Sequence, residues 1–455
     1  MRSYLIALGA VAGLMVTSGE AAAPAAATVT GGLKVPSIGV LAKPLSGTPH
    51  FSVKHANPVE QVRQLVQCGS TMYAVGSFSQ ILQRNHVFER HNVFSFHARP
   101  PFKVTSWRPT VRGTVNSITF REGRCSHAYI GGNFTSVNGK GARKIAELNT
   151  RTGRLVKRFA HSASAQVETL QAVNGRILVG GDYRSINGST ANPYMTSLNP
   201  ITGRDDGFVH LRIRGNIRFP GVVGNLTHIY NQALSHSRKL DLVIGDFASV
   251  RGRKRQQMFM INVGGARAKL TGWRSPAFNG HCDVHEPLYV RAASWSPSDG
   301  RIYIASTGRF PHGSSPKYPL TGLCDVAAAF PAAEKTVYPI WKNYTGCDSL
   351  YSTAADGSRA YFGGHDRWSM NPRGCNFKGH GAITASGMEG LAPASGRLLT
   401  NKYHTAGYYE RSRGHGADDM LRTRAGLWIA SDNFGHSQTC GFTSGLSGIC
   451  FLPNR

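Results

Sequence analysis

Histidine and carboxylate residues occur close together at several points in the C-terminal half of the chain, where they could perform acid–base chemistry. His365 opens the segment His365-Asp-Arg-Trp368, and two acids follow each other at Asp418 and Asp419. Hydrolysis of a glycoside needs two carboxyl groups that face each other across about 5–9.5 Å, one as the acid and one as the base or nucleophile. A polysaccharide lyase needs a base together with a cation that neutralises the substrate uronate. The candidate catalytic residues are Asp283, His285, His365, Glu389, Asp418 and Asp419.

None of these candidates has a spacing that is diagnostic of one reaction. Asp283, His285 and His365 could also bind a transition metal, for which imidazole is a common ligand. Each residue taken singly could equally serve on the surface or at the end of a strand. The chain has no Gly-x-Ser-x-Gly elbow, no His-Glu-x-x-His motif and no phosphate-binding P-loop. The sequence therefore leaves open whether the protein is an enzyme, and it indicates no particular cofactor.

A second set of polar residues recurs at one position of an alternating, strand-like run. Each lies 13–16 residues before the small residue of a repeated phrase and is flanked by apolar residues such as Val62 and Val115. If these runs are the innermost strands of a propeller, the polar side chains would line its central channel and could bind a polar ligand, above all a sugar. A water-filled, purely structural ring is the alternative. The predicted ligand-binding residues are Arg63, Asn116, Glu168, Asn231, Arg291 and Asp348, with Asp418 or Asp419 in the last unit, and Arg367 and Trp368 beside His365.

The repeated phrase is a short apolar run that ends in small residues and a polar turn. It reads Tyr129-Ile-Gly-Gly132-Asn-Phe134 in one copy and Leu178-Val-Gly-Gly181-Asp-Tyr183 in the next. Its small residue falls at positions 76, 132, 181, 245, 306, 364 and 431, so the mean period is about 59 residues. Such a period is typical of a four-stranded propeller blade and too long for one coil of a solenoid. The sequence predicts an all-β fold, a single seven-bladed β-propeller over residues 56–455.

The last unit ends in a strand-like run, Gly448 to Pro453, that suits the third strand of a blade. We expect the segment 26–55, in particular Lys34 to Leu41, to supply the missing outer strand and so close the ring. A closed ring has no exposed sheet edge, which would otherwise invite aggregation. The alternative is an unstructured N-terminal tail.

Several copies of the phrase resemble a known repeat. Gly131-Gly-Asn-Phe-Thr-Ser-Val-Asn-Gly139, followed by Ile145-Ala-Glu-Leu-Asn149, is similar to the delta-60-type repeat of secreted β-propeller proteins from Gram-positive bacteria. Gly180 to Gly188 is a second good copy. The resemblance covers roughly residues 60–435 and implies the propeller fold but little about activity. The repeat is most altered in its last three copies, where Ser306 and Ser431 replace the glycine.

The first residues have the features of a secretory signal peptide. Arg2 precedes a largely apolar run from Tyr4 to Val16, and the Ala-rich stretch from Ala21 to Ala27 offers small-residue cleavage sites. We therefore expect residues 1–25 to be a leader and the mature protein to be secreted, extracellular or associated with a cell wall. Export suits the eight cysteines, for which we expect four disulfides. The predicted pairs are Cys68–Cys125, Cys282–Cys324, Cys347–Cys375 and Cys440–Cys450.

The chain is strongly basic, with 52 Lys and Arg against 24 Asp and Glu and a formal net charge of +28. A secreted protein of this charge should adhere to anionic polymers. The densest basic run is Arg251-Gly-Arg253-Lys254-Arg255, and no motif for sequence-specific nucleic-acid binding is present. We therefore expect a binding protein for an anionic or polyhydroxylated polymer such as a polysaccharide or cell-wall polymer. The alternatives are a carbohydrate-active enzyme, either glycoside hydrolase or polysaccharide lyase, and a protein-interaction scaffold. No transmembrane segment is expected, and the oligomeric state stays open.

Overall fold

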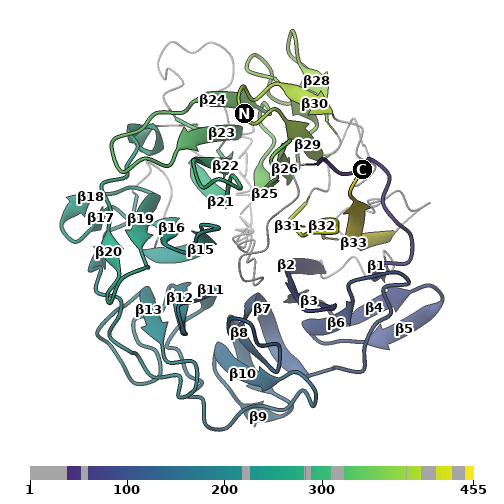
Figure 1. Cartoon of the computed structure of the whole chain (residues 1–455), viewed down its shortest axis with the longest axis vertical. Helices are drawn as coiled ribbons and strands as arrows, with labels where there is room; N and C mark the ends of the chain where they lie inside the picture. The colour runs from purple at the N-terminus through teal and green to yellow at the C-terminus, as the bar shows by residue number, and fades with distance from the viewer. Residues whose placement is uncertain are drawn as a thin grey trace, which may run out of the picture.

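The computed structural model describes residues 38–52, 60–217, 226–280, 282, 288–308, 322–385, 387–400, 417–432 and 446–455. These residues form β-strands and turns, with one short 3-10 helix at Pro276–Asn279 and no α-helix among them. Antiparallel sheets follow one another around a ring, with the first strand of each sheet nearest the centre (Figure 1). The fold is all-β and propeller-like, as the sequence predicts.

Each sheet is named here by its first strand, and its strands pair in the order given. The N-terminal half of the ring holds the sheets β2(Gln61–Cys68)-β3(Thr71–Ser77)-β6(Val93–His97), β7(Val111–Phe120)-β8(His127–Val137)-β10(Ile145–Asn149), β11(Val167–Val173)-β12(Arg176–Gly181)-β13(Met195–Leu198) and β15(His228–Leu234)-β16(Leu240–Asp246)-β19(Met258–Asn262)-β20(Lys269–Leu270).

The C-terminal half continues in the same way. It holds β21(Tyr289–Trp295)-β22(Arg301–Thr307)-β23(Val326–Pro331)-β24(Trp341–Tyr344), β25(Leu350–Ala355)-β26(Ala360–Gly364)-β29(Met388–Leu391)-β30(Leu398–Thr400) and β31(Asp419–Arg422)-β32(Gly426–Ala430)-β33(Leu446–Pro453)-β1(His50–Ser52)-β4(Gln80–Gln83)-β5(His86–Glu89). Short strands on the periphery are β9(Lys140–Gly141), β14(Ile213–Arg214), β17(Ser249–Val250), β18(Arg253–Lys254), β27(Trp368–Ser369) and β28(Ile383–Thr384).

The N-terminal segment runs antiparallel to the last strand. His50 of β1 pairs with Gly448 of β33, and further back the backbone N–H of Leu41 donates to the carbonyl of Pro453 at 2.8 Å. Within the predicted strand from Lys34 to Leu41, residues 34–37 lie outside the described ranges, and Val40 forms an isolated bridge with Asn454. The regular strand of this segment is β1, further along the chain. These pairings join the two ends of the chain.

Apolar side chains fill the space between neighbouring sheets. The ring of Trp428 contacts that of Phe96 across the interface of the β2 and β31 sheets at a centroid distance of 5.5 Å, and that of Phe451 within the β31 sheet at 4.4 Å. Trp273 and Trp295 belong to the corresponding cluster between the β15 and β21 sheets. Burial of such large side chains at each interface is the main stabilising contribution to the ring.

The repeated glycine has a steric reason. In five sheets it pairs with the first strand so closely that an added Cβ would overlap a carbonyl; at Gly132 that Cβ would lie 2.2 Å from the oxygen of Thr114. Its backbone N–H donates to the carbonyl of the residue that precedes the third strand, from Gly132 to Lys144 at 2.9 Å and from Gly181 to Tyr194 at 3.0 Å. Both acceptor residues have a positive φ, as do Asn92, Gln257 and Asp325 at the equivalent places. The phrase therefore marks a tight backbone junction.

Replacing Gly132 by alanine is expected to lower the free energy of unfolding by about 2 kcal/mol or more, since the backbone must shift to admit the methyl group. Chemical denaturation measures this change. Gly141→Ala is the matched control, because Gly141 lies in β9 with no atom within 4 Å of its added Cβ, and its stability should change by less than about 1 kcal/mol. Equal losses in both variants would refute the steric explanation.

Three predicted disulfides are present: Cys68–Cys125, Cys282–Cys324 and Cys347–Cys375. Cys68–Cys125 joins the strand-connecting turns of the adjacent β2 and β7 sheets, as expected from the repeat. The predicted pair Cys440–Cys450 rests on Cys440, which lies outside the described residues. Within the described ranges, no helix has the length and apolarity that a membrane span requires.

Candidate functional site

The first strands of the sheets carry a β-bulge at one recurring position. The pairing with the second strand shifts by one residue in the β2, β7, β11, β15, β21 and β25 sheets. A bulge leaves one residue outside the ladder and redirects its side chain. These residues are Arg63, Asn116, Glu168, Tyr230, Arg291 and Tyr351.

Arg63, Asn116 and Glu168 bond to one another across three neighbouring sheets. The Arg63 guanidinium donates from Nη1 to Oδ1 of Asn116 at 2.8 Å, and the Asn116 amide donates from Nδ2 to Oε2 of Glu168 at 2.9 Å. Asn116 is 1% exposed, whereas Arg63 and Glu168 are partly exposed. Asn116 therefore holds a cation and a carboxyl group in place at the centre of the ring.

A second group lies on the β21 and β25 sheets. The Arg291 guanidinium lies 5.6 Å from the ring centroid of Tyr351, and the Tyr351 hydroxyl lies 3.2 Å from Nδ1 of His365. The rings of Tyr351 and His365 meet edge to face at 4.8 Å. This group combines a cation, an aromatic surface and an imidazole.

Electrostatic interactions connect the two groups. Asp182 interacts with His228, and His228 interacts with Arg291, while Asp418 on the β31 sheet interacts with Arg63. We call the set Arg63, Asn116, Glu168, Arg291, Tyr351, His365 and Asp418 the central polar cluster. It brings both signs of charge to the centre of the ring.

Burial sets the protonation of the carboxyl groups in the cluster. It raises the pKa of Glu168 to about 7, against the opposing attraction of Arg63. Burial, and next the charge of Asp432, raise the pKa of Asp418 well above its usual range. Burial also lowers the pKa of His228. Glu168 can therefore exchange a proton near neutral pH, which a general acid or base requires.

Some predicted ligand-binding residues lie elsewhere. Asp348 is fully buried and accepts from Nε and Nη2 of Arg367 at 2.8 and 2.7 Å, and the Arg367 guanidinium lies 4.3 Å from the centroid of the Trp368 ring. These three residues form an internal ion pair and a stacked contact beside the β25 sheet, between the segment before β25 and the start of β27. The Arg367 guanidinium is therefore engaged by Asp348 and Trp368 rather than open to a ligand.

The bulged residue is Tyr230 in the β15 sheet and Tyr351 in the β25 sheet. The sequence predicts Asn231 and Asp348 at these two positions. Ile229 pairs with Gly245 as Val115 pairs with Gly132, so the bulged residue is Tyr230, one position earlier than Asn231. Asn231 instead donates from Nδ2 to the carbonyl of Arg291 at 2.8 Å. The two tyrosines were not predicted because the pattern was defined by strongly polar or charged residues. The apolar residue before each bulge, Ile229 and Leu350, would have located the bulged position.

The predicted catalytic residues do not form one described site. Glu389 is fully buried, and its raised pKa of about 7 has burial as its cause. Asp419 is fully buried and accepts from the backbone N–H of Leu65 at 2.7 Å, which joins the β31 and β2 sheets. Only His365 and Asp418 belong to the central polar cluster. Asp283 and His285 lie outside the described residues.

Within the described ranges, no three His, Cys, Asp or Glu side chains lie close enough to hold a metal ion.

At the interfaces between the β2, β7 and β11 sheets, the residue after each bulge accepts a hydrogen bond from the backbone of the next first strand. Gln64 accepts from the backbone N–H of Ile118 at 2.6 Å, and Ser117 accepts from that of Leu170 at 3.0 Å. These bonds, like that of Asp419 to Leu65, position the central strands.

Comparison with known proteins gives only distant structural similarities. No family model and no curated protein matches the chain. Among solved structures, the WD40 repeats of RRP9 match at 10% identity and a TM-score of 0.47, covering 91% of this chain and 100% of that one. The WD40 β-propeller domain of Doa1 matches at 12% identity and a TM-score of 0.46, covering 90% and 96%. At this level of similarity neither match indicates a function.

Proposed function

We propose that this protein is a secreted seven-bladed propeller that binds an anionic or polyhydroxylated extracellular polymer at the central polar cluster. The polymer would be a polysaccharide or a cell-wall polymer. Secretion is supported by the leader-like N-terminus and by disulfides, which persist in oxidising compartments. Seven copies of the phrase and the pairing of β1 with β33 support seven blades and a ring closed by the N-terminal segment.

The observation that carries the proposal is the bonded row Arg63–Asn116–Glu168. It presents a donor and an acceptor at fixed separation, held by a buried amide. Sugar hydroxyls both donate and accept, so they match such alternating groups. The imidazole of His365, partly exposed beside Tyr351, adds a further polar group to the same cluster. Ligand sites commonly combine convergent polar groups with groups of perturbed pKa.

A carbohydrate-active enzyme is the second candidate, and Glu168 is the specific observation that favours it. The pKa of Glu168 is about 7, and Asp182 interacts with it electrostatically and has a raised pKa through burial. A glycosidase uses such a pair, one carboxyl protonated and one ionised. A protein-interaction scaffold remains the third candidate function.

Asn116→Ala is expected to weaken glycan binding by about 10- to 100-fold, because it removes the amide that aligns Arg63 with Glu168. Binding would be measured on an array of neutral and anionic glycans and then by calorimetry. Arg291→Gln on the opposite side of the cluster serves as an independent variant. Asn85→Ala, in the exposed turn between β4 and β5, is the matched control and should bind normally.

Product analysis separates binder from enzyme. Unchanged polymer supports binding, whereas new reducing ends or unsaturated products that disappear in Glu168→Gln support hydrolase or lyase activity. Full affinity in folded Asn116→Ala and Arg291→Gln would refute the central site. Capture of a protein partner with no glycan bound would favour the scaffold.

A further inference from the structure

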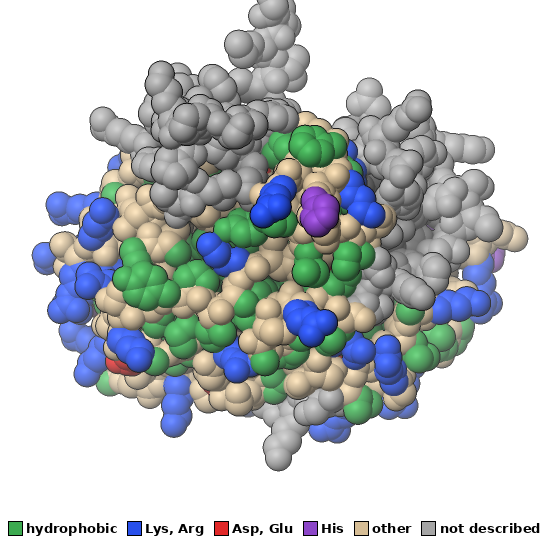
Figure 2. Space-filling model, turned by 90° about the horizontal axis from the view of Figure 1, so that it is seen from above, with side chains coloured by type: hydrophobic (Ala, Val, Ile, Leu, Met, Phe, Trp, Pro, Cys, Tyr) green, Lys and Arg blue, Asp and Glu red, His purple; other side chains and the backbone are tan. Residues whose placement is uncertain are grey.

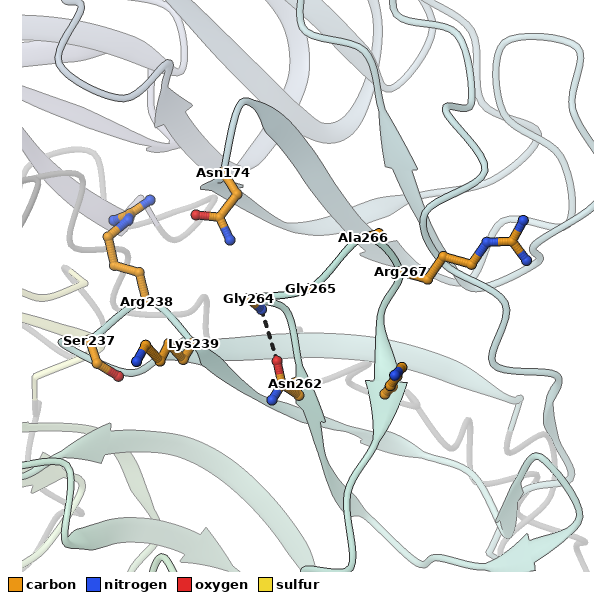
Figure 3. A pocket seen from close by; sticks show the side chains of 10 residues that line it. Asn174, Ser237, Arg238, Lys239, Asn262, Gly264, Gly265, Ala266 and Arg267 are labelled. Atoms are coloured by element: carbon orange, nitrogen blue, oxygen red, sulfur yellow. Dashed lines mark hydrogen bonds between the residues drawn. The ribbon is translucent and has the colours of Figure 1, made fainter.

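A basic pocket of about 780 Å³ opens on the rim of the β15 sheet, away from the central polar cluster (Figure 3). It lies between the turn Ser237–Lys239, which joins β15 to β16, and the loop 263–268, which joins β19 to β20, with Asn174 of the neighbouring β11 sheet at its edge. We call it the rim pocket. Its volume is within the range of about 300–1,000 Å³ that is usual for ligand sites.

Every charged side chain that lines the rim pocket is a cation. Lys239, Arg267 and Lys269 are exposed, and no ion pair joins any of them to an acid within the described part of the chain. Arg238 differs, because its guanidinium donates to Glu122 from Nε at 2.9 Å and also bonds the carbonyl of Ala172. The pocket therefore keeps three positive charges that no carboxylate neutralises.

The loop that forms the wall of the pocket is held in place by hydrogen bonds. The backbone N–H of Val263 donates to the carbonyl of Lys239 at 2.8 Å, and Nδ2 of Asn174 donates to the carbonyl of Val263 at 2.8 Å. Oδ1 of Asn262 accepts from the N–H of Gly264 at 2.9 Å, a bond drawn in Figure 3, so the amide group of Asn262 is left as a donor. The cations thus lie on both sides of a hydrogen-bonded loop that also offers the amide group of Asn262 as a donor.

We propose that the rim pocket binds tetrahedral oxyanions, the phosphate or sulfate groups carried along an anionic polymer. Ammonium and guanidinium groups, together with neutral N–H donors, satisfy the several acceptor oxygens of such a group. A carboxylate presents only two oxygens in one plane and uses fewer of these donors. This site is independent of the central polar cluster and does not rest on the function proposed there.

A second cavity, of about 290 Å³ beside the β7 sheet, has a different charge pattern. It is lined by Arg121, Arg124 and Arg158 but also contains Glu147, whose carboxyl group lies among the cations. The charge of the whole protein also favours an anionic ligand, since its formal net charge is +28. Lys and Arg side chains are spread over the face shown in Figure 2, with few acidic ones between them, so an anionic chain would be attracted from solution before it reaches a particular site.

The test uses the full chain with Lys239→Gln, Arg267→Gln and Lys269→Gln combined. Its affinity for inorganic polyphosphate and for heparin, measured by calorimetry at fixed ionic strength, is expected to fall roughly tenfold or more. The matched control combines Arg84→Gln, Arg99→Gln and Lys103→Gln, three exposed cations outside the pocket that remove the same charge. Its affinity should change less than about threefold, the share expected from net charge alone.

Equal losses in the two triple variants, or no loss in either, would overturn the proposal, because binding would then follow net charge or another surface. Polygalacturonate carries only carboxylates. If the triple rim-pocket variant lost as much affinity for polygalacturonate as for polyphosphate and heparin, the preference for tetrahedral groups would be overturned. The two polymers distinguish the ligand groups. Loss of affinity for polyphosphate alone would assign phosphate, and loss of affinity for heparin alone would assign sulfate; either outcome supports the site. The triple rim-pocket variant should keep the neutral-glycan binding that Asn116→Ala weakens, so failure of the rim pocket is distinguishable from failure of the central polar cluster.

Discussion

Replacing Arg367 by glutamine is expected to lower the free energy of unfolding by about 3–5 kcal/mol. The substitution leaves the carboxylate of Asp348 fully buried without the two guanidinium bonds at 2.8 and 2.7 Å that compensate for its desolvation. Removal of one partner from a buried ion pair costs far more than the pair itself contributes, because an uncompensated charge remains in the interior. Chemical denaturation at neutral pH measures the loss.

Arg373→Gln is the matched control, since Arg373 is exposed in the turn that follows β27 and its removal should change stability by less than about 0.5 kcal/mol. Replacing both partners, Asp348→Asn with Arg367→Gln, should recover part of the loss because no charge is then buried. If Arg367→Gln alone loses less than about 1 kcal/mol, the pair does not hold this region together. Loss of glycan binding by this folded variant would then return Arg367 to the ligand-binding residues that the sequence suggests.

Glu389→Gln is expected to make the protein less sensitive to rising pH. The pKa of Glu389 is raised from 4.5 to about 7 by burial, so the folded protein keeps a proton that the unfolded chain releases above about pH 4.5. The stability linked to this group is therefore present below that pH and is lost as the pH rises towards 7. Between pH 5 and pH 8 the wild type should lose roughly 2–3 kcal/mol relative to the variant.

Thermal and chemical unfolding of both proteins across this range measures the difference. Comparison with the variant cancels contributions from other buried groups, except Asp366, whose raised pKa is due to burial and then to Glu389 and which loses the second contribution in the variant. Glu334→Gln, at an exposed site, should leave the pH profile unchanged. Parallel profiles for wild type and Glu389→Gln would show that Glu389 is ionised in the folded protein.

Part of the central polar cluster could be predicted from the chain alone. Arg63, Asn116, Glu168 and Arg291 were found because their spacing from the repeated small residue is regular and a strand with flanking apolar residues has only two faces. Tyr230 was missed by one residue, since a one-residue change of register reverses the direction of a side chain. The bulge that sets this register has no strong local sequence pattern.

The chain from the end of β26 to the start of β27 illustrates the other limit. His365, Asp366, Arg367 and Trp368 form a conspicuous polar segment, but their roles differ. His365 contacts Tyr351 in the central polar cluster, whereas Arg367 pairs with Asp348 in the interior. Sequence proximity could not separate them, because the chain bends at His365 and Arg367, and the side-chain directions there do not follow the alternation of a strand.

The sequence by itself determined the all-β architecture, the spacing of its units and three of the disulfide pairs. These follow from local alternation, from small residues required by close backbone contact, and from a fixed period that brings equivalent positions side by side. Only the tertiary structure decided which polar groups meet one another. Buried partners such as Asp419 and Leu65 are 354 residues apart, and whether a charge is paired, desolvated or exposed depends on the neighbours that folding brings to it. That is why the rim pocket and the bonded row Arg63–Asn116–Glu168 emerge only from the folded chain.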